Sequence, residues 1–139
     1  MKHKWIAVLW VALAFAALPA AQAEEDRAAQ FEERIAETKA RLNLSDEQLE
    51  QLTPVLKSSF EAQMAVLEKH GIELENRESG NQKKLGFREA RRLRNDLDVV
   101  RKSTLEQVEG ILSEEQFSEY KKIQDERKKK MREMIKDRR

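Results

Sequence analysis

Apolar residues recur every three or four positions along most of this chain, which is the spacing of one face of an α-helix. A first stripe, in residues 26–42, consists of Phe31, Ile35, Thr38 and Leu42. No segment shows the apolar and polar alternation that is typical of a half-buried strand. The pattern therefore predicts an all-α fold that begins with a helix over residues 26–42.

A longer stripe follows and predicts a second helix. Its apolar members are Leu49, Leu52, Leu56, Phe60, Met64 and Leu67. Pro54 lies inside it, and a proline in a helix interior removes one backbone hydrogen bond and clashes with the preceding turn. We therefore expect a kink near residues 50–53, or a restart with Thr53 as cap and Pro54 in the first turn. Ser79-Gly80-Asn81 predicts the turn between the two helical halves of the chain.

Two further helices are predicted, the third over residues 82–111. Its apolar stripe consists of Leu93, Leu97, Val100, Val108 and Ile111. The fourth stripe consists of Phe117, Tyr120, Met131, Met134 and Ile135. In its middle, Gln124 and Arg127 occupy positions where apolar residues are expected. We therefore expect the end of the fourth helix to fray or to pack only against a partner, and residues 128–139 to form a basic, partly disordered tail.

The same five-residue phrase stands at the predicted starts of the second and fourth helices. Its copies are Leu44-Ser45-Asp46-Glu47-Gln48 and Leu112-Ser113-Glu114-Glu115-Gln116. In each copy the Ser can cap the first free backbone N–H groups, while the Gln reaches back to the N–H of the capping residue. The pairs that can form hydrophobic staples are Leu44 with Leu49 and Leu112 with Phe117. Two matching copies indicate an internal repeat.

The N-terminus has the pattern of a secretory signal peptide. Lys2 and Lys4 precede an uncharged apolar run over residues 5–18, and small residues before position 24 suit a signal peptidase. We expect cleavage after Ala23, so that residues 1–23 are removed. The alternative is an uncleaved anchor, but the run is shorter than the roughly 18 residues of a typical membrane-spanning helix. We therefore expect no stable membrane insertion after cleavage.

Composition favours a thin molecule that associates with a second copy. Charged residues make up 38% of the chain and aromatic residues 6%, and without cysteine the chain forms no disulfide. Residues 24–78 carry 14 acidic and 7 basic residues, a net charge of −7, whereas residues 79–139 carry 12 acidic and 18 basic residues, a net charge of +6. Because a thin monomer buries little apolar surface, we expect elongated helical hairpins paired in a curved antiparallel homodimer.

The repeated phrase resembles the LTxxQ motif, which occurs twice in the Spy/CpxP family of small bacterial periplasmic proteins. Ser45 and Ser113 stand where the family has Thr, and Ser caps a helix at least as well. The resemblance extends to the order of an export signal, a helical lead-in, two motif-led helices and a basic tail. It implies a Spy/CpxP-like helical domain over residues 24–127 and a periplasmic location.

The resemblance also implies a function, namely an ATP-independent chaperone-like protein that binds unfolded or misfolded clients during envelope stress. One alternative is an accessory regulator that docks on the sensor domain of an envelope-stress kinase. Another is a metal-resistance or metal-sensing protein. The chaperone-like protein and the regulator differ in their binding, which is tolerant of many unfolded chains in the first and selective for one folded partner in the second.

The residues themselves offer little catalytic or metal-binding chemistry. After cleavage His70 is the one remaining histidine, and there is no cysteine and no Gly-rich phosphate loop, so we expect no enzyme and no cofactor. His70 stands alone at what we expect to be a solvent-facing helix end. Met131 and Met134 could hold Cu(I), but two Met at helical spacing more often pack. We expect no metal site.

A cluster that mixes cations with an aromatic ring is the candidate client-binding surface. It consists of Phe87, Arg88, Arg91, Arg92 and Arg94. Exposed cations attract a chain over a distance, and neighbouring apolar groups then hold it weakly. Apolar residues that lie off the main stripes are Val55, Val66, Phe87 and Val99. Nucleic acid, a common partner of basic runs, is not expected for an exported protein.

Overall fold

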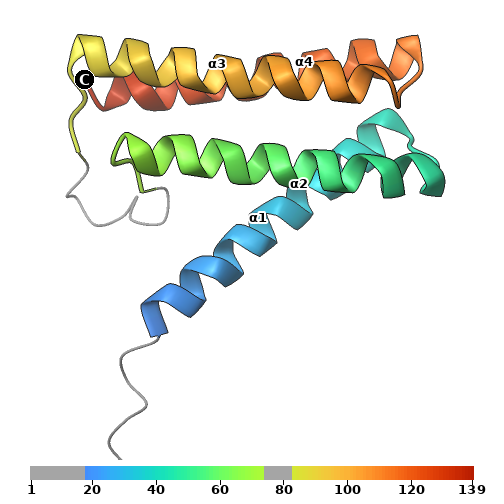
Figure 1. Cartoon of the computed structure of the whole chain (residues 1–139), viewed down its shortest axis with the longest axis horizontal. Helices are drawn as coiled ribbons and strands as arrows, with labels where there is room; N and C mark the ends of the chain where they lie inside the picture. The colour runs from blue at the N-terminus through green and yellow to red at the C-terminus, as the bar shows by residue number, and fades with distance from the viewer. Residues whose placement is uncertain (1–17, 74–82) are drawn as a thin grey trace, which may run out of the picture.

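The computed structural model describes residues 18–73 and 83–139, and these residues form four α-helices without a strand (Figure 1). The helices are α1 (Leu18–Leu42), α2 (Asp46–Lys69), α3 (Phe87–Glu109) and α4 (Glu114–Asp137). The predicted all-α class is thus confirmed. The predicted turn at Ser79-Gly80-Asn81 and residues 1–17 of the predicted signal peptide lie outside the described residues.

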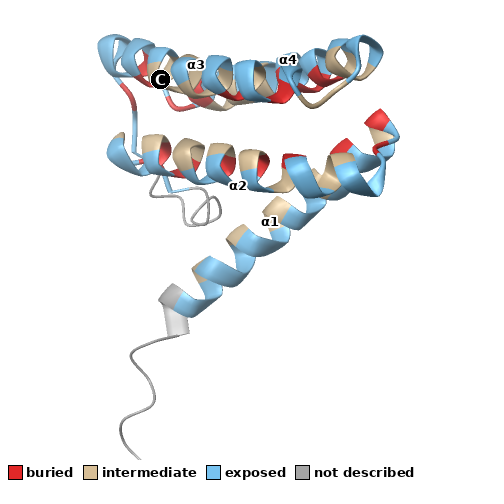
Figure 2. Cartoon of the chain, turned by 45° about the vertical axis from the view of Figure 1, so that its right-hand side comes forward, coloured by how far each residue is buried: buried red, intermediate tan, exposed pale blue. Residues whose placement is uncertain are grey.

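The four helices form two layers. In one layer α3 and α4 lie side by side, and α2 lies beneath them with α1 crossing it at an angle (Figure 1). α1 packs on α2 and α4, and α3 packs on the same two helices. The N-terminal half of α1 leaves this bundle, and residues 21–30 within it are mostly exposed (Figure 2).

The core consists of two apolar clusters, one toward each end of the elongated bundle. The first joins the end of α2 to the start of α3 and the end of α4, through Phe60, Met64, Leu67, Ile72, Leu85, Ala90, Leu93 and Ile135. The second surrounds the repeated motifs, through Leu42, Leu44, Leu52, Leu56, Val108, Tyr120 and Ile123. The predicted stripes supply most of these side chains, because residues three or four apart share one helix face.

Two helix ends are set by residues in the left-handed backbone region. α1 stops before Asn43, whose φ is 49°, and Asn tolerates this region better than most residues. α2 stops before Gly71, whose φ is 71°. The N–H groups of Gly71 and Ile72 bond to the carbonyl oxygens of Glu68 and Leu67, both at 2.9 Å, which is a Schellman motif. Gly71 therefore ends α2 instead of weakening it.

α2 continues through Pro54 without a break. The predicted restart with Thr53 as cap is wrong, because the Thr53 hydroxyl donates instead to the carbonyl oxygen of Leu49 in the preceding turn, at 2.6 Å. The alternative, a kink near residues 50–53 within this continuous helix, stays a prediction.

The expectation of a partly disordered basic tail is wrong, since α4 extends to Asp137 and packs within the same chain. Ile135 is only 1% exposed in the first core cluster. The carbonyl oxygen of Arg138 accepts a hydrogen bond from the N–H of Leu85 at 2.9 Å. This bond holds residues 83–86 outside the helix, so α3 starts at Phe87 and not at the predicted residue 82.

Replacing Ile135 by Ala tests whether the end of α4 is part of the core. The variant should lose about 2–5 kcal/mol of unfolding free energy, because it removes a buried side chain and leaves a cavity. Lys129→Ala, an exposed change on the same helix, should stay within about 0.5 kcal/mol of the parent. Urea unfolding measures both. If Ile135→Ala unfolds like the parent, the last turns of α4 do not pack as described.

Candidate functional site

Both motifs form complete capping boxes. In the first, Oγ of Ser45 accepts from the N–H of Gln48 at 3.1 Å, and Oε1 of Gln48 accepts from the N–H of Ser45 at 3.2 Å. Ser113 and Gln116 repeat these bonds at 3.2 and 3.1 Å. The staple residues all belong to the second core cluster, and they are Leu44, Leu49, Leu112 and Phe117. Each motif therefore starts a helix and anchors that start in the core.

The two motif glutamines also bond to each other. Nε2 of Gln48 donates to Oε1 of Gln116 at 2.7 Å, and Nε2 of Gln116 donates to Oε1 of Gln48 at 3.0 Å. Each amide nitrogen also donates to a backbone carbonyl at the other corner, Gln48 to Ile111 at 3.5 Å and Gln116 to Leu42 at 3.2 Å. Every donor and acceptor position of both amides is thereby used. We call this arrangement of Gln48 and Gln116 the amide pair.

The sequence predicted the two caps but not the contact between them. A capping box uses one lone pair of the Gln oxygen and neither amide hydrogen, so three bonding positions per side chain remained without an assigned partner. Both motifs carry Gln and not Glu at this position. This shared choice is the sequence signal from which the contact between the two side chains could have been predicted. Two carboxylates in these positions would repel each other, whereas two amides are self-complementary.

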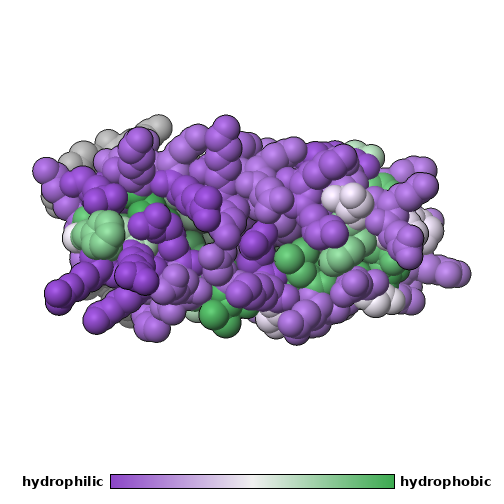
Figure 3. All heavy atoms as spheres, turned by 90° about the horizontal axis from the view of Figure 1, so that it is seen from above, coloured by the Kyte–Doolittle hydropathy of each residue, from purple (hydrophilic) through white to green (hydrophobic). Residues whose placement is uncertain are grey.

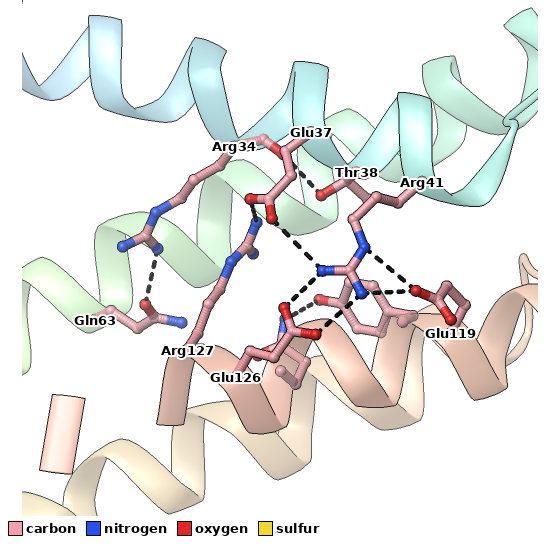
Figure 4. A network of polar contacts seen from close by, with 10 residues as sticks. Arg34, Glu37, Thr38, Arg41, Gln63, Glu119, Glu126 and Arg127 are labelled. Atoms are coloured by element: carbon pink, nitrogen blue, oxygen red, sulfur yellow. Dashed lines mark hydrogen bonds and ion pairs between the residues drawn. The ribbon is translucent and has the colours of Figure 1, made fainter. Parts of the chain in front are cut away.

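A network of charged groups joins α1 to α4 (Figure 4). The guanidinium of Arg41 on α1 bonds to Glu119 and Glu126 on α4, with N···O distances of 2.6 Å to each. Arg127 on α4 bonds back to Glu37 on α1 at 3.1 Å. Hydrogen bonds from Arg41 hold the pKa values of Glu119 and Glu126 below their usual range. We call these five residues the α1–α4 network.

The interruption in the fourth apolar stripe is occupied by polar groups that find partners. Gln124 is buried, and its amide donates to the Tyr120 hydroxyl at 2.7 Å. Burial raises the pKa of Tyr120 to about 12. Arg34 donates to Oε1 of Gln63 at 3.1 Å, and its guanidinium lies 5.0 Å from the centre of the Phe60 ring. The helix therefore does not fray here, because Tyr120 on α4 itself and Glu37 on α1 satisfy the polar groups of Gln124 and Arg127.

The candidate client-binding residues divide between two sides of α3. Phe87, Arg91 and Arg94 are four and three residues apart and share one side, whereas Arg88 and Arg92 lie on the next. Arg94 is half-buried, with Nε donating to the carbonyl oxygen of Ala90 at 3.2 Å, and the other three arginines are exposed. The structure thus gathers most of the cluster on the surface but turns Arg94 inward.

Two of the four apolar residues that lie off the main stripes are strongly exposed, Phe87 at 61% and Val99 at 68%. The other two, Val55 and Val66, are partly buried and pack against the core clusters. The Arg139 guanidinium lies 5.1 Å from the centre of the Phe87 ring. On the side of α3 and α4, hydrophobic residues appear as separate patches in a hydrophilic surface (Figure 3).

We call one surface the outer face of α3, and define it by the exposed residues Arg88, Arg92, Asn95, Val99 and Lys102. Their spacing of four and three residues places them along one line of the helix, opposite the buried Ala90 and Leu93. Phe87 borders this line at its N-terminal end. The face therefore offers cations beside apolar groups on a helix that the core holds in place.

The prediction that His70 faces solvent at a frayed end is wrong. His70 is the C-cap of α2, its side chain is 11% exposed, and its Nε2 lies 2.9 Å from Oδ2 of Asp96 on α3. Lys69 bonds to the same oxygen at 3.2 Å. These two hydrogen bonds lower the pKa of Asp96 below its usual range. His70 thus ties α2 to α3.

Within residues 18–73 and 83–139, no three His, Asp or Glu side chains gather in an arrangement that could hold a metal ion. Met131 and Met134 are half-buried and pack against the first core cluster. None of the helices in these ranges combines the length and apolar character needed to cross a membrane.

The fold and the amide pair define a small all-α protein whose two hairpin corners carry the same motif and bond to each other. The model of the LTXXQ motif family matches residues 30–124, and the chain belongs to this family, the family of Spy/CpxP-type proteins. The family is typically periplasmic and is not known as enzymatic. No curated protein and no solved structure matches the chain.

The amide pair can be tested with the isosteric substitution Gln→Met. Gln48→Met and Gln116→Met should each lower the unfolding free energy by about 1–3 kcal/mol, because each leaves the other amide with unmet hydrogen bonds. The double variant should lose less than the sum of the two, since the polar partners then leave together. Gln51→Met, on the exposed side of α2, is the control. If the double variant loses the full sum of the two single losses of unfolding free energy, measured in urea, Gln48 and Gln116 do not bond to each other.

The α1–α4 network predicts a dependence of stability on pH. Because the folded pKa values of Glu119 and Glu126 are lowered, their stabilisation is present above the ordinary Glu pKa of about 4.3 and is lost as the pH falls through the folded values. Arg41→Gln should therefore be less stable than the parent at pH 7 and lose less stability on acidification. Urea unfolding from pH 7 to pH 3 measures this, with Arg91→Gln as the control. Parallel pH profiles for parent and Arg41→Gln would contradict it.

Proposed function

We propose that this protein is a periplasmic, ATP-independent chaperone-like protein that binds unfolded or misfolded clients on the outer face of α3 and on Phe87. The observation that carries the proposal is the exposure of Phe87 and Val99 beside arginines on the same helix. Membership of the LTXXQ family supports it, because the resemblance to Spy/CpxP-type proteins implies this function.

Cations and apolar groups would act at different stages of binding. Arg88, Arg91 and Arg92 attract acidic segments of a collapsing chain over about 8–10 Å, the range that screening leaves at ordinary ionic strength. Phe87 and Val99 then cover a small apolar area, and burial contributes only about 25 cal/mol for each Å² removed from water. Binding of this kind is weak and tolerant of sequence, which suits a protein that must release its clients.

We also propose that the protein works as a homodimer. Supporting observations are the net charges of −7 and +6 in its two halves and the exposed N-terminal half of α1, which lies outside the bundle. Sedimentation in metal-free buffer should show a dimer at micromolar concentration that dissociates as salt is added, because exposed charges of opposite sign are screened. A folded monomer at all salt concentrations would refute the dimer and leave the client-binding proposal standing.

Two variants distinguish the residues that speed association with a client from those that slow its dissociation. Arg91→Gln with Arg92→Gln should slow the capture of an acidic unfolded client and make the remaining rate less sensitive to salt, because steering charges act mainly on association. Phe87→Ser should instead raise the dissociation rate with little change in salt dependence, because lost apolar contact acts mainly on dissociation. Stopped-flow binding at two salt concentrations measures both rates.

The matched control removes the same charge elsewhere, with Lys57→Gln on α2 and Lys129→Gln on α4. Both lysines are exposed, so the control changes net charge without touching α3. If this control slows capture as much as the arginine variant, net charge and not the outer face of α3 attracts clients. If all variants bind like the parent while their helicity is intact, the client surface lies elsewhere. Binding that is restricted to one folded sensor domain would favour the regulatory alternative.

A further inference from the structure

A cleft of about 240 Å³ lies between α1, α3 and α4. Its rim includes Arg34 of α1 and Gln63 of α2, and most of its wall comes from α3 and the second half of α4. The volume corresponds to about eight water molecules at roughly 30 Å³ each. It is therefore large enough for one short alkyl chain and too small for a lipid with two.

The walls of the cleft carry a large excess of positive charge. Seven Arg and Lys side chains line it, against the single carboxylate of Asp98. Asp98 is already engaged, by Lys128 at 2.7 Å and by Arg101 at 3.7 Å. Arg127 is paired with Glu37 of the α1–α4 network. The other four cations form no ion pair with a described residue, and they are Arg34, Arg94, Lys130 and Arg132.

The same cleft has an apolar side. It is lined by Leu97, Met131, Met134 and Ile135. Ile135 belongs to the first core cluster, and the other three pack against it, so these side chains are held in place by the core. Met side chains adapt to the shape of an apolar guest. An occupant with one apolar part and one anionic part would therefore match both kinds of wall.

The charge on the cationic wall also favours a bound anion. Burial and the neighbouring charge of Arg127 lower the pKa of Arg34 to about 10, which shows that positive charge is held here at a cost. An anionic group in the cleft would reduce that cost, because it screens the repulsion between the two guanidinium groups.

We propose that this cleft binds an anionic amphiphile with one short alkyl chain, such as a fatty acid. The head group would lie among the unpaired cations, and the chain would lie against Leu97, Met131 and Met134. This site is separate from the outer face of α3, so the proposal does not depend on client binding. Arg94 lines the cleft, which explains why it is turned away from the exposed arginines.

Decanoate, below the concentration at which it forms micelles, is the probe. The full chain has four methionines, and labelling their methyl groups with ¹³C gives one NMR signal for each. Decanoate should shift the signals of Met131 and Met134 and leave that of Met64, buried in the core, nearly unchanged. Butyrate supplies the charge without the chain, and a nonionic decyl glycoside supplies the chain without the charge. Both should bind at least tenfold more weakly.

A pair of double variants tests the cations. Lys130→Gln with Arg132→Gln removes two exposed charges that line the cleft, and decanoate affinity should fall roughly threefold to tenfold, with a weaker dependence on salt. Lys129→Gln with Lys136→Gln removes two exposed charges of the same helix that do not line it, and affinity should not change. Thermal unfolding of both variants checks that the fold is intact.

Several results would overturn the proposal. If decanoate leaves the Met131 and Met134 signals unchanged, the cleft does not bind it. If both double variants weaken binding equally, or if Met64 shifts as strongly as Met131, the association is unspecific. If the Met131 and Met134 signals change when the ligand-free protein is diluted, a second copy of the chain occupies the cleft instead.

Discussion

The amide pair of Gln48 and Gln116 fixes two helix starts relative to each other, and the arrangement of both hairpins follows from it. Each glutamine completes its own cap and bonds to the backbone of the other corner, so neither corner can move without breaking bonds in both. The staple residues then bring the second core cluster together around this point. In a chain with no disulfide, this polar contact takes the role that a covalent link has in many small exported domains.

The way α1 is attached differs from the way the other helices are. α2 and α3 share much of the first core cluster, whereas α1 adds ion pairs around Arg41 and Arg127 to its apolar contacts with the second cluster. Partly exposed ion pairs contribute little each and are screened by salt. α1 is therefore held most firmly at its C-terminal end, beside the amide pair, and its other end leaves the bundle.

Features that depend on a few neighbouring residues were predictable from the sequence. The caps at Ser45 and Ser113 and the apolar stripes needed only helical spacing and the preferences of Ser and Gln. Features that depend on distant partners were not. The end of α4 looked disordered because Gln124 and Arg127 interrupt its stripe, and the residues that satisfy them lie on the same helix and on α1.

The candidate client-binding surface was also only partly predictable, because burial depends on residues that are distant in the sequence. Phe87, Val99, Val55 and Val66 all lie off the main stripes, but only Phe87 and Val99 are strongly exposed, whereas Val55 and Val66 pack partly buried against the core clusters. His70 was misjudged because its partner, Asp96, is on another helix.

The amide pair also bears on how such a protein can change over evolutionary time. A substitution at one glutamine removes hydrogen bonds from both corners. The intact copy of the motif therefore cannot compensate for the altered one. The two positions therefore depend on each other, although 68 residues separate them in the chain. Sequence drift should therefore be tolerated within each motif at the exposed acids, and at the glutamines only when both change together.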